Sequence, residues 1–419
     1  YGSIKIYVIL LSEIPNQEEP HMLTGKTVVL AVSGSIAAYK IPNLARMLKK
    51  LGCDVQVLMT RNATNFINPI TFESLTSNKC LIDTFDRNFQ YSVEHVALAK
   101  KADVVMIAPA SANVIGKIAN GIADDMLTTT VMACPCKKII SPAMNHNMFH
   151  NPIVQDNMDK LIRFDYEIIP PDSGMLANGD SGDGRMPDEK VLLQYILKEI
   201  ACKKDLAGKK ILVTAGATRE SIDPVRFITN HSSGKMGCAI ANAAMLRGAE
   251  VTLVHGHLET EAPMFVKRIP VTSAAEMFEA VTSISGEQDI IVKAAAVADY
   301  TPVTIADNKI KKTEGDMSIP LKRTRDILSF LGEHKKAGQL ICGFSMETEN
   351  LLANSQKKLI SKNCDMICAN SLKVSGSGFG TDTNIVTIIT EKLVEELPMM
   401  DKEEAAHIIL DKLLELLTC

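Results

Sequence analysis

The sequence has no tryptophan, and aromatic residues make up only 5% of its 419 residues. This scarcity argues against a platform of aromatic side chains that would stack on single-stranded nucleic acid. The formal net charge of −4 gives the chain no general attraction for nucleic acid or for an anionic membrane surface. The sequence also lacks an apolar run of about 20 residues, the length that spans a bilayer as a helix. We therefore expect neither nucleic acid nor a membrane as a partner.

The ten cysteines lack the spacing of a metal site. The close pairs, Cys134 with Cys136 and Cys364 with Cys368, have no second pair in register with them. Scattered thiols of this kind are typical of reduced cysteines in a cytosolic protein. The sequence thus predicts a cytoplasmic protein.

A chain of this length is too long for one hydrophobic core, which predicts two domains. The first residues differ from the rest, because the apolar stretch Ile6–Leu11 is shorter than a signal-peptide core and no small-residue cleavage site follows it. We interpret residues 1–21 as a tail, 22–202 as the first domain, 203–208 as a polar linker and 209–419 as the second domain.

The second domain is organised around the stretch 210–237. Its β-branched run Ile211–Thr214 predicts a buried strand, and Gly216 follows that strand at once. The residues 230–235 (NHSSGK) then precede a helical pattern. The free backbone N–H groups at the start of this helix and the lysine side chain would surround one point, as in triphosphate binding. The polar triplet 218–220 (TRE) favours the same interpretation. An ordinary strand–turn–helix remains the alternative.

The first domain begins with a strand at Thr27–Val32, a tight turn at 33–35 and a helix from Ile36. This order predicts the first βα unit of a doubly wound sheet, in which phosphate commonly lies on the helix N-terminus. The turn lacks the full dinucleotide glycine fingerprint. The second strand, Val55–Met59, ends in Thr60 at the carboxyl edge of the sheet.

Two further strand ends in this domain carry polar residues. The strand Val104–Ala108 precedes Ser111 and Asn113 in a segment rich in small residues. This composition indicates either a loop that a ligand can approach closely or a small-residue helix packed on the sheet. The strand Ile139–Ser141 leads into 142–148 (PAMNHNM), whose side-chain amides we expect over the binding crevice.

His95 and the loop Asp172–Pro187 stand apart from these strand ends. A lone histidine is usually structural or exposed, so the residues alone do not assign His95 to catalysis. The loop is rich in Gly and Asp, which predicts a mobile lid or clamp, with a plain surface loop as the alternative. The helix Asp188–Ile200 closes the domain.

The second domain continues with strands at Val251–Val254 and Ile290–Val292 and a helix at Ala274–Ser283, which predicts a second doubly wound α/β domain of Rossmann-like type. Asp299 follows a strand end, where a carboxylate suits Mg²⁺ or nucleotide phosphate. The basic run 309–312 (KIKK) is either a solvated face or a triphosphate clamp.

Several long motifs occur in one order. The first domain contains SGSIAAYK, APASANVIGKIANGIADD, PAMNHNM and a GxLAxGDxGxGRM clamp. The second contains TAGATRE, DPVRFITNHSSGKMG, KAAAVADY, KIKK and GFSMETE. From Met22 to the end, the chain resembles the bifunctional enzymes of coenzyme A synthesis. In that family a phosphopantothenoylcysteine decarboxylase is fused to a phosphopantothenate–cysteine ligase.

For the first domain the resemblance implies a flavodoxin-like fold that binds FMN, with contacts from Gly34, Ser35, Thr60, Ser111, Asn113 and Met144. It implies His95 as the essential base or orienter and Asn145 as the anchor of the substrate carboxylate. Direct loss of CO₂ would leave an unstabilised carbanion. Oxidation of the thiol side to a thioaldehyde by the flavin removes that obstacle.

The clamp departs from the family at Asn178, where the family has a cysteine. That cysteine is the general acid when the reduced flavin returns its hydride to the ene-thiol. A thiol with a pKa of about 8.5 can give up a proton, whereas a carboxamide only donates a hydrogen bond. Because general acid assistance contributes roughly 10²- to 10⁴-fold, the sequence predicts that this chain forms the oxidised ene-thiol and returns reduced flavin slowly.

For the second domain the resemblance implies that 4′-phosphopantothenate attacks CTP to form an acyl-cytidylate, from which the amine of cysteine displaces CMP. Lys309 serves the first half-reaction and Asn230 the second. The implied nucleotide-binding positions are Ala295, Asp299, Lys309, Arg325, Asp326, Ile327, Leu328, Phe344, Lys358 and Lys362, with Mg²⁺ at Asp299. The family usually reads Asn-Pro-Asp-Ile at 324–327, so Arg325 stands where a proline would preset the backbone.

The resemblance also implies a homo-oligomer, a trimer-based dodecamer, because the flavoprotein half forms trimer-based shells and the ligase half forms dimers. The small-molecule partners are 4′-phosphopantothenate, cysteine, CTP and phosphopantothenoylcysteine. The missing acid keeps an alternative open, namely a flavin-binding regulatory or scaffold protein in which only the ligase half is catalytically competent.

Overall fold

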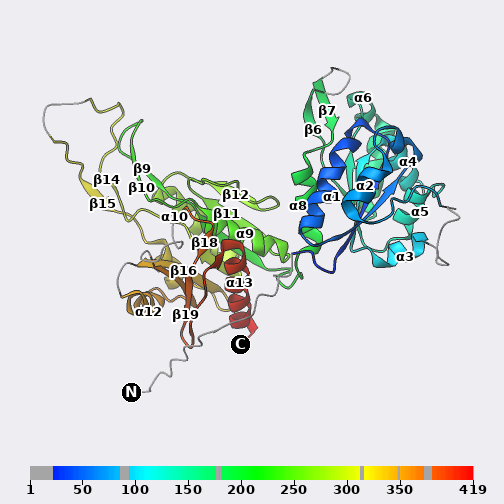
Figure 1. Ribbon diagram of the computed structural model, residues 1–419. Coiled ribbons are helices and arrows are strands. Elements are labelled where there is room, and N and C mark those ends of the chain that lie inside the picture. Colours follow the sequence, from blue (N-terminus) through cyan, green and yellow to red (C-terminus); the bar gives the residue numbers. More distant parts are fainter. Residues whose placement is uncertain are drawn as a thin grey trace. The chain divides into compact units, whose positions relative to one another are not determined.

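The computed structural model describes residues 22–84, 94–175, 179, 181–311, 316–347, 350–371 and 380–418. The chain divides into two compact units, one ending at Cys202 and the other beginning at Lys203. Each unit is a mixed α/β structure built on its own sheet, as the sequence predicts (Figure 1).

The sheet of the first unit has the strand order β2-β1-β3-β4-β5, and its strands are parallel to their neighbours. This is the flavodoxin-like order, in which the direction of winding reverses between β1 and β3. The strands are buried almost throughout, which is why their sequences read as continuous apolar runs. Their bounds are β1 Thr27–Val32, β2 Asp54–Met59, β3 Val104–Ala110, β4 Lys137–Pro142 and β5 Glu167–Ile168.

Helices cover both faces of this sheet (Figure 1). Val29 and Ala31 of β1 face a core formed with α3, α4, α5 and α7, and the opposite face of the sheet meets α8. The helix expected from Ile36 is instead a short 3₁₀ turn followed by α1, where Pro42 starts a new helix with its preset φ. The bounds are η1 Ile36–Lys40, α1 Ile41–Lys50, η2 Arg61–Asn65, α2 Pro69–Thr76, α3 Glu94–Lys101, α4 Ala112–Ala119, α5 Met126–Ala133, α6 His146–Phe149, α7 Pro152–Arg163 and α8 Glu189–Ile200.

The segment expected as a lid loop contains a two-stranded antiparallel hairpin, β6 Asp172–Met175 with β7 Ser181–Arg185. The loop prediction was therefore wrong for these residues, because main-chain pairing overrides their low strand propensity. Gly184 lets the hairpin approach the sheet: its φ is +125°, and an added Cβ would lie 2.3 Å from the carbonyl oxygen of Met144. The hairpin tip, including Asn178, lies outside the described residues.

The sheet of the second unit has the order β12-β11-β8-β13-β16-β17-β19-β20. From β12 to β17 neighbouring strands are parallel, in the Rossmann order with its switch point between β8 and β13, and β19 and β20 add antiparallel strands at one edge. The bounds are β8 Lys210–Ala215, β11 Glu250–His255, β12 Lys267–Pro270, β13 Ile290–Lys293, β16 Leu340–Glu347, β17 Met366–Ser371, β19 Val386–Thr390 and β20 Val394–Glu396.

Helices and short ribbons complete the second unit. The helices are α9 Lys235–Leu246, α10 Ala274–Ile284, η3 Ser285–Glu287, α11 Ile327–Glu333, α12 Leu351–Ser361 and α13 Lys402–Thr418. The ribbons pair β9 Arg219–Ser221 with β10 Phe227–Thr229, β14 Tyr300–Pro302 with β15 Leu321–Arg323, and β18 Thr383–Asn384 with β21 Met400–Asp401. The first two ribbons lie at the same end of the unit (Figure 1).

Residues 203–208, expected as a linker, pack onto the second unit. Leu206 is fully buried, and Asp205 forms an ion pair with the buried Arg247 at a distance of 2.8 Å between Oδ1 and Nε. Among the described residues, no helix has both the length and the apolar composition needed to cross a bilayer.

Candidate active sites

In the first unit, polar residues cap the helical turns that follow the strands β1 to β4. Ser35 accepts a hydrogen bond from Ala37 N–H at 3.4 Å, and Thr60 accepts one from Ala63 N–H at 3.2 Å. Ser111 and Asn145 do the same at the starts of α4 and α6, at 3.4 and 2.9 Å. Side-chain oxygens in this position satisfy otherwise unpaired N–H groups. The four residues therefore stand at the carboxyl edge of the sheet, where doubly wound proteins bind ligands.

A cavity of about 1050 Å³ opens at this edge, beside the switch point. Its lining includes four positions expected to contact the cofactor, namely Gly34, Thr60, Ser111 and Asn113. The cavity's basic side chains are already paired, because Arg61 binds Asp83 at 2.8 Å and Lys117 binds Asp124 and Asp125 at 2.6 and 3.1 Å.

A second cavity, of about 520 Å³, is lined by three further expected positions: Ser35, Met144 and Asn145. Its other wall comes from the hairpin, through Gly184, Arg185 and neighbouring residues. Gly34 and Ser35 are adjacent in the chain, so the two cavities flank the end of β1.

His95 lies in the first turn of α3 and is half-buried. Among the described residues it is not part of the lining of either cavity. The structure thus brings the expected cofactor positions and Asn145 to one sheet edge, but it does not bring His95 to them within one protomer.

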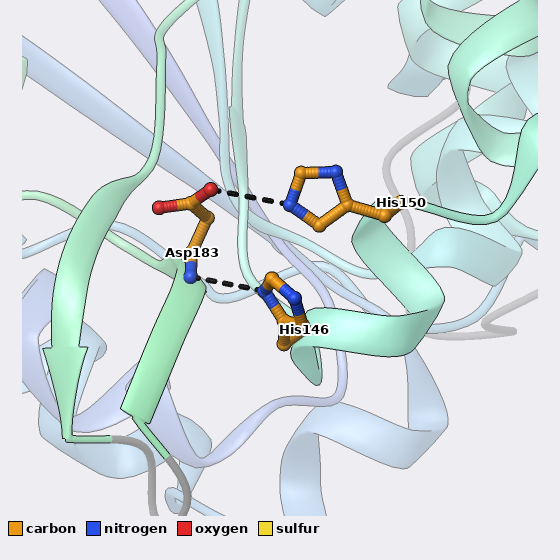
Figure 2. A group of neighbouring side chains, drawn as sticks. All are labelled: His146, His150 and Asp183. Atoms are coloured by element: carbon orange, nitrogen blue, oxygen red, sulfur yellow. Dashed lines mark hydrogen bonds and ion pairs between the residues drawn. The ribbon is translucent and has the colours of Figure 1, made fainter.

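A cluster that the sequence reading did not identify holds the hairpin against α6 (Figure 2). The backbone N–H of Asp183 donates to Nδ1 of His146 at 3.2 Å, and Nε2 of His150 lies 3.1 Å from the Asp183 carboxylate. The Ser173 hydroxyl donates to the same carboxylate, and this bond, together with His150, lowers the pKa of Asp183. The spacing of two histidines four residues apart in HNMFH was the signal available in the sequence.

One ligand atom from each of His146, His150 and Asp183 lies within 4.8 Å of the others, a spacing that could hold a metal ion. In the structure, however, Nδ1 of His146 accepts the N–H of Asp183, and Nε2 of His150 faces the Asp183 carboxylate. These contacts hold the hairpin against α6.

In the second unit, the predicted phosphate-binding turn has the geometry that the glycines indicate. Gly216 ends β8 with φ +78°, and an added Cβ would lie 2.4 Å from the carbonyl oxygen of His257. Gly234 is the N-cap residue of α9, and within the described residues no side chain accepts a hydrogen bond from the first turn of this helix. The first-turn N–H groups of α9 are therefore available to an anion. The expected cation Lys235 is engaged, because its ammonium group binds Asp382 at 2.6 Å.

Two residues of the polar triplet 218–220, Thr218 and Glu220, are engaged with the backbone of neighbouring segments. Thr218 is fully buried and accepts the N–H of Ala298 at 3.0 Å, and Glu220, 3% exposed, accepts the N–H of Ala274 at 2.8 Å. These residues position the segment before Asp299 and the start of α10.

Charged residues gather around the ends of β13 and β16. Lys362 binds Asp326 at 2.8 Å, and Lys358 donates to the carbonyl oxygen of Phe344 at 2.8 Å. Lys293, which the sequence analysis did not identify, is the last residue of β13 and lies near Asp299. Burial lowers the pKa of Lys293 to about 8, and the positive charge of Lys358 contributes to this shift. Other expected nucleotide positions are part of the protein interior here, namely Ala295, Ile327 and Leu328.

The side chain of Arg325 contacts α10. Glu279 of α10 accepts a hydrogen bond from its guanidinium, which lies 3.9 Å from the ring centroid of Phe278. The side chain that replaces the family's proline is therefore held by α10 in this structure.

The loop that carries Lys309 is held by the turn between β9 and β10. Asp223, 2% exposed, accepts the N–H of Ile310 at 3.1 Å, and Arg226 donates to the carbonyl oxygen of Ile310 at 3.0 Å. Asp223 and Arg226 also bind each other, and this bond holds the pKa of Asp223 well below its usual range. Lys309 is exposed beside Ile310, and Asn230 is exposed just after β10.

Two family models match the chain: "Flavoprotein" over residues 16–201, and "DNA/pantothenate metabolism flavoprotein C-terminal domain" over residues 206–417. The coenzyme A biosynthesis bifunctional protein CoaBC of Bacillus subtilis is 46% identical over 396 residues, which cover 94% of this chain and 97% of that protein. The chain belongs to the CoaBC family. CoaBC of Escherichia coli K12 is 40% identical over 93% of this chain and 97% of that protein.

A solved structure of the C-terminal domain of a CoaBC protein is 45% identical and covers 51% of this chain and 97% of that chain, with a TM-score of 0.44. As a CoaBC protein, the chain is a bifunctional enzyme of coenzyme A biosynthesis. Its flavoprotein domain is the decarboxylase part, and its C-terminal domain is the ligase part.

Proposed function

We propose that this CoaBC protein ligates 4′-phosphopantothenate to cysteine with CTP, and then decarboxylates the resulting phosphopantothenoylcysteine with FMN. The observation that supports this most is the placement of the motif residues. In each unit they lie at the carboxyl ends of parallel strands, beside the switch point of the sheet. Two separate groups of motif residues suit two consecutive reactions on one substrate.

In the ligase unit, the substrate carboxylate attacks the α-phosphate of CTP, forming the acyl-cytidylate and releasing pyrophosphate. Negative charge builds on the phosphates, where Lys309 and Lys358 neutralise it and the uncapped N–H groups of α9 donate to it. Asp299, exposed near these groups, provides a carboxylate for Mg²⁺, which also binds phosphate oxygens.

In the second half-reaction the amine of cysteine attacks the acyl carbon and CMP leaves. Asn230 stands beyond β10, on the ribbon whose turn holds the Lys309 loop. Its amide donates a hydrogen bond to the acyl group, which orients the carbonyl for attack.

The first unit offers a suitable cradle for FMN. Gly34 has no room for a side chain, since an added Cβ would lie 2.7 Å from the Cβ of Asn62. The helix-capping residues around Gly34 present hydroxyl and backbone N–H groups. When bound, FMN supplies the two-electron oxidation that makes CO₂ loss possible. Ser35, Thr60, Ser111 and Asn113 hold it, Met144 borders it, and Asn145 holds the substrate carboxylate.

We also propose that the protein works in the cytoplasm as a trimer-based homo-oligomer, up to a dodecamer. His95 lines neither cavity of its own protomer. Its proposed role as base or orienter therefore requires that it approach a crevice within that assembly.

One incubation with 4′-phosphopantothenate, cysteine and either CTP or ATP, read by product mass, tests both halves. We expect product with CTP only. In air, where O₂ reoxidises the reduced flavin, we expect this product to accumulate as the decarboxylated ene-thiol, two hydrogens lighter than 4′-phosphopantetheine, because Asn178 cannot act as an acid. Asn178→Cys should raise the rate of saturated product by roughly 10²-fold or more. Rapid formation of saturated product by the unaltered chain would refute the failed proton transfer, and absence of any coupled product would refute the proposed function.

A further inference from the structure

The smaller cavity of the first unit has an unbalanced charge. Lys40 and Arg185 line it, and none of its lining residues is an aspartate or a glutamate. The larger cavity differs, because there Arg61 and Lys117 are each paired with carboxylates. A cavity with two cations and no anion is stabilised by an anionic ligand.

Both cations have donors to spare. Lys40 donates to the carbonyl oxygen of Met186 at 3.2 Å, which uses one of the three N–H groups of its ammonium. Within the described part of the chain, no hydrogen bond or ion pair of the Arg185 side chain is found, although Asp172 lies opposite it across the hairpin. A guanidinium group presents a planar fork of N–H donors, which matches two oxygens of a phosphate group.

The rest of the cavity suits an extended molecule with an apolar arm. Met144, Met175 and Met186 supply flexible apolar surface. Asn145, the proposed anchor of the substrate carboxylate, lines the same cavity. A substrate fixed at one end by Asn145 can therefore place its other end against the hairpin.

We propose that this cavity binds the phosphomonoester end of the decarboxylase substrate, with Arg185 and Lys40 as the groups that recognise the phosphate. The inference rests on the proposed function and adds to it a device that selects phosphorylated over unphosphorylated pantothenoyl compounds. Because Arg185 belongs to β7, the described strands of the hairpin contribute to substrate selection.

The phosphate of FMN is the other phosphomonoester that could meet these cations. The larger cavity is better suited to it, since Gly34, Thr60 and Ser111 present backbone N–H and hydroxyl groups at the starts of helical turns. Retention of flavin by a variant separates the two ligands.

The test compares CO₂ release from phosphopantothenoylcysteine and from its dephosphorylated form by the flavin-loaded, full-length protein. We expect Arg185→Gln to lower kcat/KM for the phosphorylated substrate about 10- to 100-fold, mainly through KM, and to leave the dephosphorylated substrate within about twofold. Arg185→Lys should retain part of the preference. Arg163→Gln, the same change at an exposed arginine of α7, should behave as the unaltered protein.

Three results would overturn the inference: equal losses for both substrates, no loss for either, or a loss of bound flavin from Arg185→Gln. The first would mean a structural role, the second a phosphate bound elsewhere, and the third a contact with FMN. Failure of the proposed function looks different, because then the unaltered protein would release CO₂ from neither substrate.

Discussion

At the scale of single residues, the positions that could be read from the sequence are those at strand ends. Thr60 and Ser111 each follow a buried apolar run directly, so their place at the carboxyl edge follows from the strand alone. Lys293 also ends a strand, yet its importance was not visible. Its surroundings come from residues distant in the chain, chiefly Lys358 and Asp326, and no local pattern distinguishes it from a surface lysine.

The lowered pKa of Lys293, about 8, predicts a pH dependence of nucleotide binding. As pH rises from 7 to 9 the lysine loses its charge, so we expect the affinity for CTP to fall by up to about tenfold. Lys293→Met should bind CTP more weakly at pH 7 and show a flatter profile. Calorimetric titrations at several pH values measure this, and a steep profile in Lys293→Met would assign the titration to another group.

The lowered pKa of Lys293 also makes the stability of the fold depend on pH. The folded-state pKa of Lys293 lies below the ordinary value of 10.5, so between about pH 8 and 10.5 the unfolded chain binds more protons than the folded one. The free energy of unfolding therefore rises with pH across that window and is lowest below it.

At the scale of elements, two hairpins hold segments that we propose act on substrate. The first, β6 with β7, was expected as a loop, because Gly and Asp are rare in strands and its pairing partners lie across a turn. The second, β9 with β10, fixes the Lys309 loop through contacts between Asp223 and Ile310, which are 87 positions apart. Asp223 and Ile310 both lie in motifs of the sequence, but nothing in the sequence indicates that these two motifs contact each other.

Asp223 is therefore predicted to position Lys309. Asp223→Asn keeps an oxygen that can accept backbone N–H groups but loses the charge that binds Arg226, so we expect CTP-dependent pyrophosphate release to fall about 10-fold or more. The KM for CTP should rise, and Asp223→Glu should recover part of the activity. CO₂ release by the same polypeptide is the internal control. Unchanged pyrophosphate release would remove Asp223 from this role.

At the scale of the whole molecule, the sequence predicted two doubly wound α/β folds, and both sheets confirm this. Strand-length apolar runs and the turns after them determine such sheets locally, which is why the prediction succeeded. The behaviour of residues 203–208 could not be predicted, because the ion pair of Asp205 depends on Arg247, which only the folded second unit places there.

The central claim is that each unit contains its own site and performs its own reaction, and paired variants in the full chain test it most directly. Lys309→Gln should abolish CTP-dependent pyrophosphate release and leave CO₂ release from supplied phosphopantothenoylcysteine unchanged. Asn145→Asp, which can still cap α6 but repels the substrate carboxylate, should do the reverse. Loss of both activities in either correctly folded variant, or retention of both, would contradict two independent sites.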